Sequence, residues 1–483
     1  MQSVHFASFK MHTSRFDFKL FSADRVGRAF ASMGSCNGED SPGLREWITV
    51  VLGCSVTFLF SYFFYGWAAM QAIFEADGVY KEICPEEEPL CSDRGSRMIF
   101  LFSVDNTVTI FAGTALGIAI DRTGPVALCI LGGVFQAAGL LLMGIGNGDP
   151  NAAADTLLFA FVISGIGGTA LMLQSLKLAF IVAPRHFALV MAIANCLVDG
   201  SSVVPLGLYR LYVAGLSRQW VFSGYAVLCF LLSMCLAVSW HGAPSARLSA
   251  ANRKESAAAT SEAEGLCPRL HGLTVRQQLP TIEFAFAVTF MVTQVFRSNA
   301  YLGVIKSLLQ GLGDDENVYM QILTISLPAS TLFVCLFDMS LKKGGFAFTF
   351  FVVLFLGLTW NITMLLPSLP LQVLGFAAFT NFRGLLFASF FTFVGHSFGN
   401  RTFGRINALL WFCAGILSLL VHPCVEISKQ WTGDLVAMNI FMLALCFPAV
   451  LMTVVLSIHL CRNPAGDIKV LNSKPAEVAE SSA

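Results

Sequence analysis

The sequence predicts an all-α polytopic membrane protein whose twelve transmembrane helices form two groups of six. Of its 483 residues, 55% are hydrophobic and only 12% are charged, about half the charged fraction of a soluble domain. Twelve apolar stretches have roughly the 20 residues that a helix needs to cross the hydrocarbon core of a bilayer. The polar segment 242–280 separates the first six stretches from the last six.

The first group of helices is expected within residues 46–241. Residues 1–45 are polar and lack an apolar core like that of a cleavable signal peptide, so we expect a cytosolic tail there. The six apolar stretches that follow are residues 47–70, 98–120, 125–146, 156–178, 186–212 and 219–241. Each is long enough to cross the bilayer once.

The second group of helices is expected within residues 281–461. Residues 242–280, rich in Ala, Ser, Glu and Arg, are typical of a flexible cytosolic linker. The six apolar stretches after it are residues 281–304, 318–341, 345–366, 369–395, 404–427 and 434–461. Residues 462–483 are expected to form a short cytosolic tail.

The distribution of Lys and Arg predicts that both termini are cytosolic. These residues concentrate in the tails, the linker and the loops on the same side, as the positive-inside rule requires of the cytosolic face. The loop that holds Cys84 and Cys91 is then outside the cell, where a disulfide can form. The sequence alone does not establish that bond. We expect the plasma membrane as the location of the protein, with a vacuolar or organellar membrane left open.

The second apolar stretch carries the features that indicate transport. It contains an acid, Asp105, and an amide, Asn106. Because a charged side chain at the centre of a membrane helix costs ~2.5–3.5 kcal/mol, Asp105 is expected to face protein or a watery cavity. Gly113 and Gly117, four residues apart, allow a neighbouring helix to approach closely.

The end of this stretch resembles a motif of the major facilitator superfamily. Residues 117–124 read G-x-x-x-D-R-x-G, the pattern between the second and third helices of that superfamily, with Asp121 and Arg122 at its centre. The resemblance implies a pseudo-symmetric bundle of six plus six helices, in which Asp121 braces the inner gate against the start of the eleventh helix. Pro125 and Val126 replace the basic residues that usually follow, which weakens the gating role. The alternative is a solvated helix end.

The strongest signal within the apolar stretches is a set of four charged residues, Asp105 and Asp199 in the first half and Arg297 and Arg383 in the second. Acids and bases in an apolar bundle can neutralise each other across the interface between halves, where such proteins bind substrate. A site with both signs suits a zwitterion, because a guanidinium can hold the carboxylate while an acid or amide receives the ammonium. The alternative is a structural lock, and Arg297 could instead be a snorkelling side chain.

Further polar and aromatic residues complete the candidate substrate site. They are Tyr65, Asn106, Gln174 and Tyr301. We expect Arg297 or Arg383 to hold a substrate carboxylate and Asp199, Asn106 or Gln174 to lie near the ammonium. Taken singly, the tyrosines favour a packing role over contact with a ligand.

A narrower resemblance extends from about residue 60 to 425. The stretches that carry it are Gly66-Trp67, Gly78-Val79-Tyr80, Asp105-Asn106, Gly167-Gly168, residues 199–202, 297–303 and 365–376, Arg383-Gly384 and Phe403-Gly404. They resemble the system L-type amino-acid facilitators of solute carrier family 43, except that Asp105 stands where that family has an amide. The resemblance implies facilitated diffusion of large neutral or aromatic amino acids by alternating access. Related protozoan transporters vary in specificity, so the substrate does not carry over.

Two alternatives remain open at this level. Asp105 or Asp199 could titrate while facing alternate sides, which would make the protein a proton-coupled symporter of amino acids or another small organic solute. A transporter-like nutrient sensor would bind a signalling partner through its tails or linker. No metal-ligand spacing, nucleophile elbow or paired catalytic carboxylates are present, so we expect neither an enzyme nor a metal or cofactor. The zero net charge argues against a nucleic-acid partner. Only substrate and lipid are expected as partners, with a monomer as the default.

Overall fold

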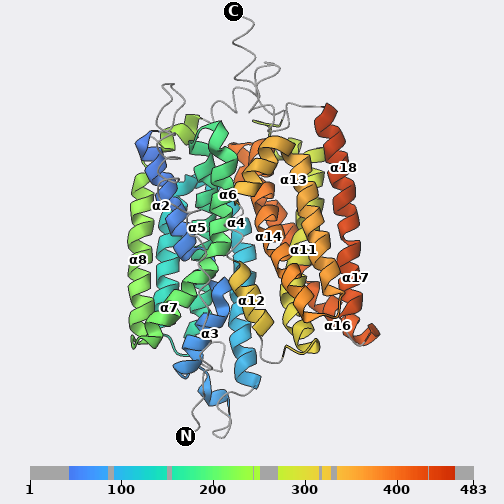
Figure 1. Cartoon of the computed structure of the whole chain (residues 1–483). Coiled ribbons are helices and arrows are strands. Elements are labelled where there is room, and N and C mark those ends of the chain that lie inside the picture. The colour runs from blue at the N-terminus through green and yellow to red at the C-terminus, as the bar shows by residue number, and fades with distance from the viewer. Residues whose placement is uncertain are drawn as a thin grey trace, which may run out of the picture. The chain divides into compact units, whose positions relative to one another are not determined.

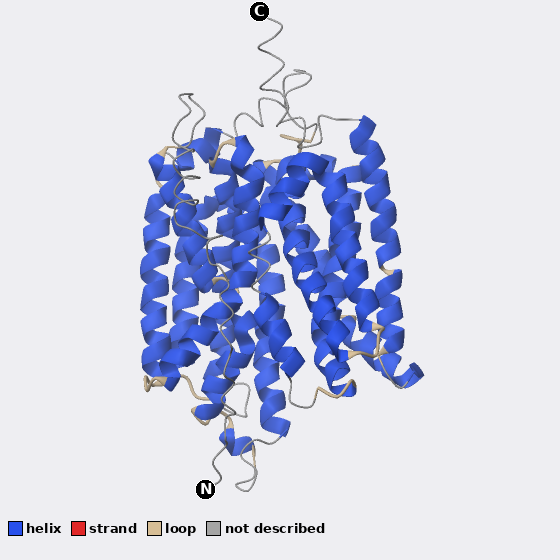
Figure 2. Cartoon of the chain, in the orientation of Figure 1, coloured by secondary structure: helices blue, strands red, loops and turns tan. Residues whose placement is uncertain are grey.

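The structure, a computed structural model, describes residues 43–84, 92–148, 155–242, 244–250, 270–314, 318–327, 334–432 and 435–462. Within these ranges the regular elements are all helices (Figure 2). The expected all-α class is therefore confirmed. Most of both predicted tails, part of the linker and Cys91 lie outside the described residues. Cys84 is disulfide-bonded, and its pairing with Cys91 stays a prediction.

The first half of the chain follows the predicted order of apolar stretches (Figure 1). Its helices are α2 (Leu44–Phe60), α3 (Trp67–Ala76), α4 (Ser92–Ile145), α5 (Thr156–Leu176), α6 (Pro184–Gly200), α7 (Val204–Val213) and α8 (Arg218–Ser239). A 3-10 turn, Phe63–Gly66, joins α2 to α3 within the first predicted stretch. The fifth predicted stretch is likewise divided, between α6 and α7.

The second half begins with a short helix at the end of the linker. Its elements are α10 (Val275–Gln278), α11 (Ile282–Gly311), α12 (Val318–Ser326), α13 (Val334–Met364), α14 (Leu369–Phe398), α15 (Asn400–Ser418), α16 (Val421–Thr432), α17 (Val436–Ala444) and α18 (Cys446–Arg462). The boundary between halves at residues 242–280 stays a prediction.

Two glycines divide the longest helices. Gly124 in α4 has a φ of 78° and Gly345 in α13 has a φ of 73°, a left-handed region that glycine enters without the steric penalty of a Cβ. Gly124 comes at the end of the 117–124 motif and is followed by Pro125, which can begin a helix because its missing N–H is not needed there. The second and third predicted helices are therefore the two arms of α4.

Nine helical segments among the described residues are long and apolar enough to cross a membrane. One of them, Phe100–Ile145, contains both arms of α4. The predicted stretch 281–304 is helical within α11, but it is not among the nine, and 318–341 falls partly outside the described residues. The number of twelve crossings therefore stays a prediction.

The buried and exposed helices differ as expected for a bundle in lipid. Most residues of α14 and of the second half of α5 are buried. By contrast, α8 and α18 lie at opposite edges of the helices in Figure 1 and expose large apolar side chains such as Leu231 and Phe447. Exposed apolar surface of this kind is stable against hydrocarbon rather than against water.

Small residues permit the closest packing between α4 and α5. A Cβ added at Gly167 would lie 2.3 Å from the backbone nitrogen of Gln136, well inside van der Waals contact. The obstacle is backbone, which cannot move aside as a flexible side chain can. The second arm of α4 therefore depends on a residue without a side chain at this position of α5.

Replacing Gly167 with alanine should destabilise the bundle by ~1–3 kcal/mol, the usual cost of overpacking. The apparent melting temperature of the purified protein in detergent measures this effect. Gly207→Ala is the matched control, because Gly207 in α7 has nothing within 4 Å of an added Cβ. An unchanged melting temperature for Gly167→Ala would contradict the observed packing.

Candidate functional site

A chamber between helices from both sides of the linker holds several of the predicted site residues. Asn106 and Phe387 are part of its wall. An adjoining hollow shares Phe387 and adds Asn195 and Asp199. Tyr65 and three other residues, Tyr62, Arg383 and Trp411, line both hollows. We call the two hollows together the central chamber.

One ion pair crosses the central chamber. Arg383 Nε on α14 donates a hydrogen bond to Asp199 Oδ1 on α6 over 3.1 Å, and Arg383 Nη1 donates to Ser298 Oγ on α11 over 3.4 Å. Both ionised residues are buried, with 7% and 8% of their surfaces exposed. Removing one partner of such a pair leaves an uncompensated buried charge, which costs ~3–5 kcal/mol. The pair therefore joins α14 to α6 at the level of the chamber.

Aromatic rings enclose the guanidinium of Arg383. Its Cζ lies 5.1 Å from the ring centroid of Tyr65 and 5.5 Å from that of Phe387. Phe387 in turn stacks on Trp411, with ring centroids 5.9 Å apart. Desolvated contacts between a cation and an aromatic face contribute up to ~2 kcal/mol. A guanidinium has five N–H donors, so Asp199 and Ser298 do not exhaust its capacity to bind a carboxylate.

Asp105 lies beside the chamber but forms no ion pair among the described residues. The next residue, Asn106, lines the chamber, whereas Asp105 is fully buried and neither of its carboxyl oxygens has a hydrogen-bond partner there. Its Oδ1 lies 3.0 Å from the position of an added Cβ at Gly165 of α5. Of the four predicted buried charges, Asp199 and Arg383 pair, and Asp105 does not.

Arg297 occupies a different environment, inside the second half. Its Nη1 donates to Gln294 Oε1 over 2.6 Å, and its Nη2 donates to Gly357 O and Asn361 Oδ1 over 2.7 and 3.0 Å. The side chain lies over the ring of Trp360, 5.0 Å from its centroid, and is fully buried. The snorkelling alternative for Arg297 is therefore wrong. Arg297 lines neither hollow of the chamber, so in this conformation it does not reach a substrate there.

Two other predicted contacts also lie outside the chamber wall. Tyr301 packs on Trp360 and Phe379, with ring centroids 4.9 and 4.2 Å away. Gln174 Nε2 donates to Leu171 O over 3.0 Å. Its Oε1 accepts a hydrogen bond from Trp240 Nε1 of α8 over 3.4 Å. Tyr301 therefore packs against residues of the second half of the chain, and Gln174 against residues of the first. For Tyr301 this agrees with the packing alternative.

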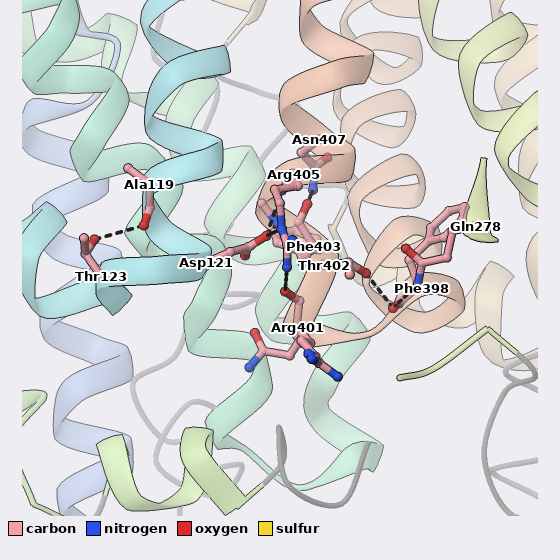
Figure 3. Close-up of polar contacts among 12 residues, drawn as sticks. Ala119, Asp121, Thr123, Gln278, Phe398, Arg401, Thr402, Phe403, Arg405 and Asn407 are labelled. Atoms are coloured by element: carbon pink, nitrogen blue, oxygen red, sulfur yellow. Dashed lines mark hydrogen bonds and ion pairs between the residues drawn. The ribbon is translucent and has the colours of Figure 1, made fainter. Parts of the chain in front are cut away.

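Asp121 contacts the beginning of α15, as the motif at 117–124 implies. Its carboxylate accepts hydrogen bonds from the backbone N–H groups of Gly404 and Arg405 over 3.0 and 2.9 Å, and from Arg405 Nε over 3.4 Å. Figure 3 shows Asp121 reaching from α4 toward Arg405. A carboxylate is favourable near a helix N-terminus because the aligned peptide dipoles leave that end partly positive.

Lys177 completes this arrangement at the end of α5. Its Nζ lies 3.1 Å from Asp121 Oδ1 and 2.9 Å from both the backbone oxygen and the side-chain Oδ1 of Asn400. The ammonium also faces the rings of Phe180 and Phe403, 5.6 and 5.3 Å from their centroids. We call Asp121, Lys177, Asn400 and Arg405 the gate cluster. It holds α4, α5 and α15 together.

The helices α4 and α15 touch at two glycines next to the gate cluster. A Cβ added at Gly117 would lie 2.7 Å from Gly404 O, and one added at Gly404 would lie 2.2 Å from Gly117 O. Gly117 thus lies where two helices pack closely, as predicted. Arg122 is exposed and lines a separate hollow at this end of the bundle together with Arg401. The acid of the motif is therefore engaged in the cluster, and the adjacent base faces outward.

The sequence analysis missed several residues of these sites, among them Asn400 and Arg405 of the gate cluster. Phe387 and Trp411 line the central chamber, and Lys177 belongs to the gate cluster. Trp411 carried a usable signal, because it lies inside the stretch 404–427 rather than at the interface where tryptophan is enriched. Lys177 at the end of an apolar stretch looked like an ordinary basic residue at the membrane surface. Its burial follows only from the position of α15.

Comparison with known proteins adds sequence relatives, although no family model matches the chain. It is 25% identical over 206 residues to the human large neutral amino acids transporter small subunit 3, and 26% identical over 197 residues to arginine transporter 1 of Toxoplasma gondii. These alignments cover 39% and 38% of this chain and 36% of each relative. The chain thus matches little more than a third of their length. Protein FMP42 of Saccharomyces cerevisiae is 22% identical over 82% of this chain and 90% of its own.

Solved structures identify the fold. The proton:xylose symporter XylE, a major facilitator superfamily protein, aligns with a TM-score of 0.55 at 14% identity over 86% of this chain and 95% of its own. The fucose:proton symporter FucP of E. coli aligns with a TM-score of 0.54 at 10% identity over 84% and 98%. At such identities the likeness establishes the fold alone. The chain is therefore an integral membrane protein with the major facilitator fold, similar in sequence to amino-acid transporters.

Proposed function

We propose that the protein transports amino acids across a membrane by alternating access, with the substrate bound in the central chamber. The observation that carries this proposal is the buried pair of Asp199 and Arg383, one charge from each half, in the wall of that chamber. A zwitterion presents both signs within one small molecule. The sequence similarity to amino-acid transporters supports the same substrate class.

The ion pair can exchange partners with such a substrate. Arg383 would bind the substrate carboxylate in a charge-assisted fork, while Asp199 would receive the ammonium group. Each protein charge then keeps an opposite charge beside it, so neither is left buried and unpaired. Asn106, which reaches the chamber from α4, can donate to the carboxylate or accept from the ammonium.

The aromatic wall favours large neutral or aromatic side chains. Tyr62, Phe387 and Trp411 offer apolar faces, and the ionised residues of the wall, Asp199 and Arg383, already neutralise each other. A substrate ring could pack on these faces in the offset or edge-to-face arrangements that aromatic pairs adopt. Among the described residues of this wall, a charged substrate side chain would find no further opposite charge.

The gate cluster would close one end of the path. Its contacts hold α4 and α15, which belong to different halves, against each other. Because the positive-inside rule assigns this end to the cytosol, the conformation described is one with the cytosolic gate shut. Opening requires Asp121 to leave α15, and rocking of the two halves would then expose the chamber to the cytosol. We propose the plasma membrane as its location, with both termini cytosolic.

Arg383→Gln should lower the uptake of radiolabelled leucine and phenylalanine at least ~10-fold, because a hydrogen bond to a charged group contributes ~1.5–3 kcal/mol. Initial uptake in oocytes, corrected for the amount of protein at the surface, measures the effect. Asn381→Gln is the control on the same helix, since the side chain of Asn381 donates to Ala377 O within α14. Wild-type uptake by Arg383→Gln would refute the proposed site.

The double variant Asp199→Asn, Arg383→Gln separates a binding role from a structural lock. Arg383→Gln leaves Asp199 buried without its partner and should lower the melting temperature. Removing both charges leaves no unpaired ion, so the melting temperature of the double variant should return toward that of the wild type. Uptake should stay as low as in Arg383→Gln, because the substrate has lost both counter-charges. Recovery of uptake together with stability would assign the pair to a lock alone.

Competition of labelled leucine by each of the other amino acids tests the substrate class. Large neutral and aromatic amino acids should compete at the lowest concentrations, and acidic and basic ones should compete weakly, because the wall has no spare counter-charge. Measured inhibition constants in expressing oocytes check this ranking. Stronger competition by arginine or lysine would contradict the neutral-substrate assignment.

Gly117→Leu should prevent gate closure, because a side chain at this position meets the backbone of Gly404. We expect uptake to fall at least ~10-fold while the purified protein still binds labelled substrate, since an overpacking cost of ~1–3 kcal/mol falls on the closed state alone. Scintillation proximity measures binding, and Gly207→Leu is the control. Full uptake by Gly117→Leu would refute the gate, whereas substrate binding without uptake in the wild type would favour the nutrient-sensor alternative.

A further inference from the structure

A hollow beside the gate cluster is lined by more bases than acids. Of the described residues around it, four are basic and one is acidic, namely Arg122, Lys177, Arg401, Arg405 and Asp121. Asp121 is already engaged by Lys177 and Arg405. The hollow has a volume of about 370 Å³. One water molecule takes up only ~30 Å³ in the liquid. The hollow therefore has both the space and the charge to receive an anion.

Two of these bases stand at the end of a helix that disfavours positive charge. Arg401 and Arg405 lie in the first turns of α15, on the same face of the helix (Figure 3). The aligned peptide dipoles leave a helix N-terminus partly positive, so a base there is unfavourable and an anion is favourable. The positive-inside rule accounts for bases on this side of the membrane, but not for their convergence on one hollow. An anion between them would relieve the repulsion.

The linker contributes a hydroxyl group to the same hollow. Residues 244–250 are helical, and Ser245, Leu248 and Ser249 line the hollow. The hydroxyl of Ser245 donates to Trp240 O, and this residue is only partly exposed. Ser249 is exposed. It is therefore the serine of this wall that an enzyme in solution can reach.

The linker segment, residues 244–250, is attached to the first half of the chain. Arg247 Nε lies 3.0 Å from Glu46 Oε1 of α2, and Leu248 is buried. The segment therefore moves with α2, whereas the two arginines of α15 belong to the second half. A helix of so few residues is only marginally stable by itself, so the segment can leave this surface and rejoin it. When it leaves, Arg247 stands two residues before an accessible serine, a pattern that basophilic protein kinases recognise.

We propose that Ser249 is a phosphorylation site and that the hollow receives its phosphate, so that the modification holds the gate closed. The inference rests on the proposed transport function and orientation, which place this hollow in the cytosol, where ATP and protein kinases are found. A phosphoserine carries about −1.5 to −2 charges at pH 7 and three strong acceptor oxygens. Charge-assisted hydrogen bonds from Arg122, Arg401 and Arg405 would tie the linker segment to α15.

The phosphoryl group comes from ATP. With a protein kinase as catalyst, Ser249 Oγ attacks the γ-phosphorus and forms a new P–O bond. The bond from the γ-phosphorus to the bridging oxygen breaks, and its electron pair leaves with ADP. The hydroxyl proton of the serine passes to the catalytic carboxylate of the kinase.

The modification slows transport because of where its contacts lie. Opening of the gate carries α15 away from the linker segment. It must then break the contacts of the phosphate as well as those of Asp121. Phosphorylation therefore favours the closed gate over the open one.

Phosphorylation of the purified full chain by a basophilic kinase with ATP is the direct test. Mass spectrometry should locate the phosphate on Ser249, and the melting temperature should rise with it, because the new contacts exist only in the folded protein. Phosphatase treatment should return the melting temperature to its original value. Ser249→Ala, incubated in the same way, should show no rise. Absence of phosphate from Ser249, or a phosphate that leaves the melting temperature unchanged, overturns the proposal.

Uptake by charge variants in oocytes tests the effect on the gate. Ser249→Glu supplies part of the phosphate charge and should lower initial uptake ~5-fold, the most that one exposed ion pair usually gives. Ala246→Glu is the matched control, because Ala246 is exposed on the same segment and does not line the hollow. The fall should shrink in a background of Arg122→Gln and Arg401→Gln, two bases outside the gate cluster. Equal falls for both glutamate variants, or a fall that this background leaves unchanged, overturn the proposal.

The two readouts separate this inference from the function on which it rests. A phosphate-dependent rise in melting temperature, without uptake of any amino acid, refutes the transport function and leaves the phosphate site in place. Uptake of amino acids that Ser249→Glu does not alter refutes the role of the phosphate alone. Inorganic phosphate that raises the melting temperature of Ser249→Ala would instead assign the hollow to a free anion and overturn the proposed modification.

Discussion

The ion pair between Asp199 and Arg383 is the interaction on which the central chamber depends. It joins α6 to α14 through a contact of 3.1 Å, and these helices lie on opposite sides of the linker in the sequence. Hydrocarbon cannot solvate either charge, so each requires the other or a substrate group in its place. Under the proposed function, a molecule that takes the place of this contact must therefore carry both signs.

The buried charges named by the sequence analysis lie in different environments. Arg383 is neutralised by the carboxylate of Asp199. Arg297 donates hydrogen bonds through Nη1 and Nη2 to the amide oxygens of Gln294 and Asn361 and to a backbone carbonyl, all in the second half of the chain. Asp105 has neither kind of partner among the described residues. The ion pair thus links α6 to α14, whereas the contacts of Arg297 connect α11 and α13.

The contact between α4 and α15 depends on small residues as much as on charge. The backbones of Gly117 and Gly404 approach so closely that neither tolerates a Cβ. This approach brings Asp121 within hydrogen-bonding distance of the first turns of α15, and Lys177 then bridges Asp121 to Asn400. The gate cluster thus depends on the contact between α4 and α15. A larger residue in place of Gly117 or Gly404 would separate these helices and break the hydrogen bonds of the cluster, although none of its four residues is changed.

The sequence by itself determined the all-α membrane class, the order of the apolar stretches and four of the buried charges, because hydropathy and helix length are local properties of the chain. It also placed Asp121 opposite the start of α15 through a recognisable motif. Only the tertiary structure decided that Arg383 pairs with Asp199, that Arg297 turns away from the chamber, and that Lys177 is buried. Which way a side chain points depends on how each helix is rotated against its neighbours, and that rotation is fixed by packing between segments far apart in the sequence.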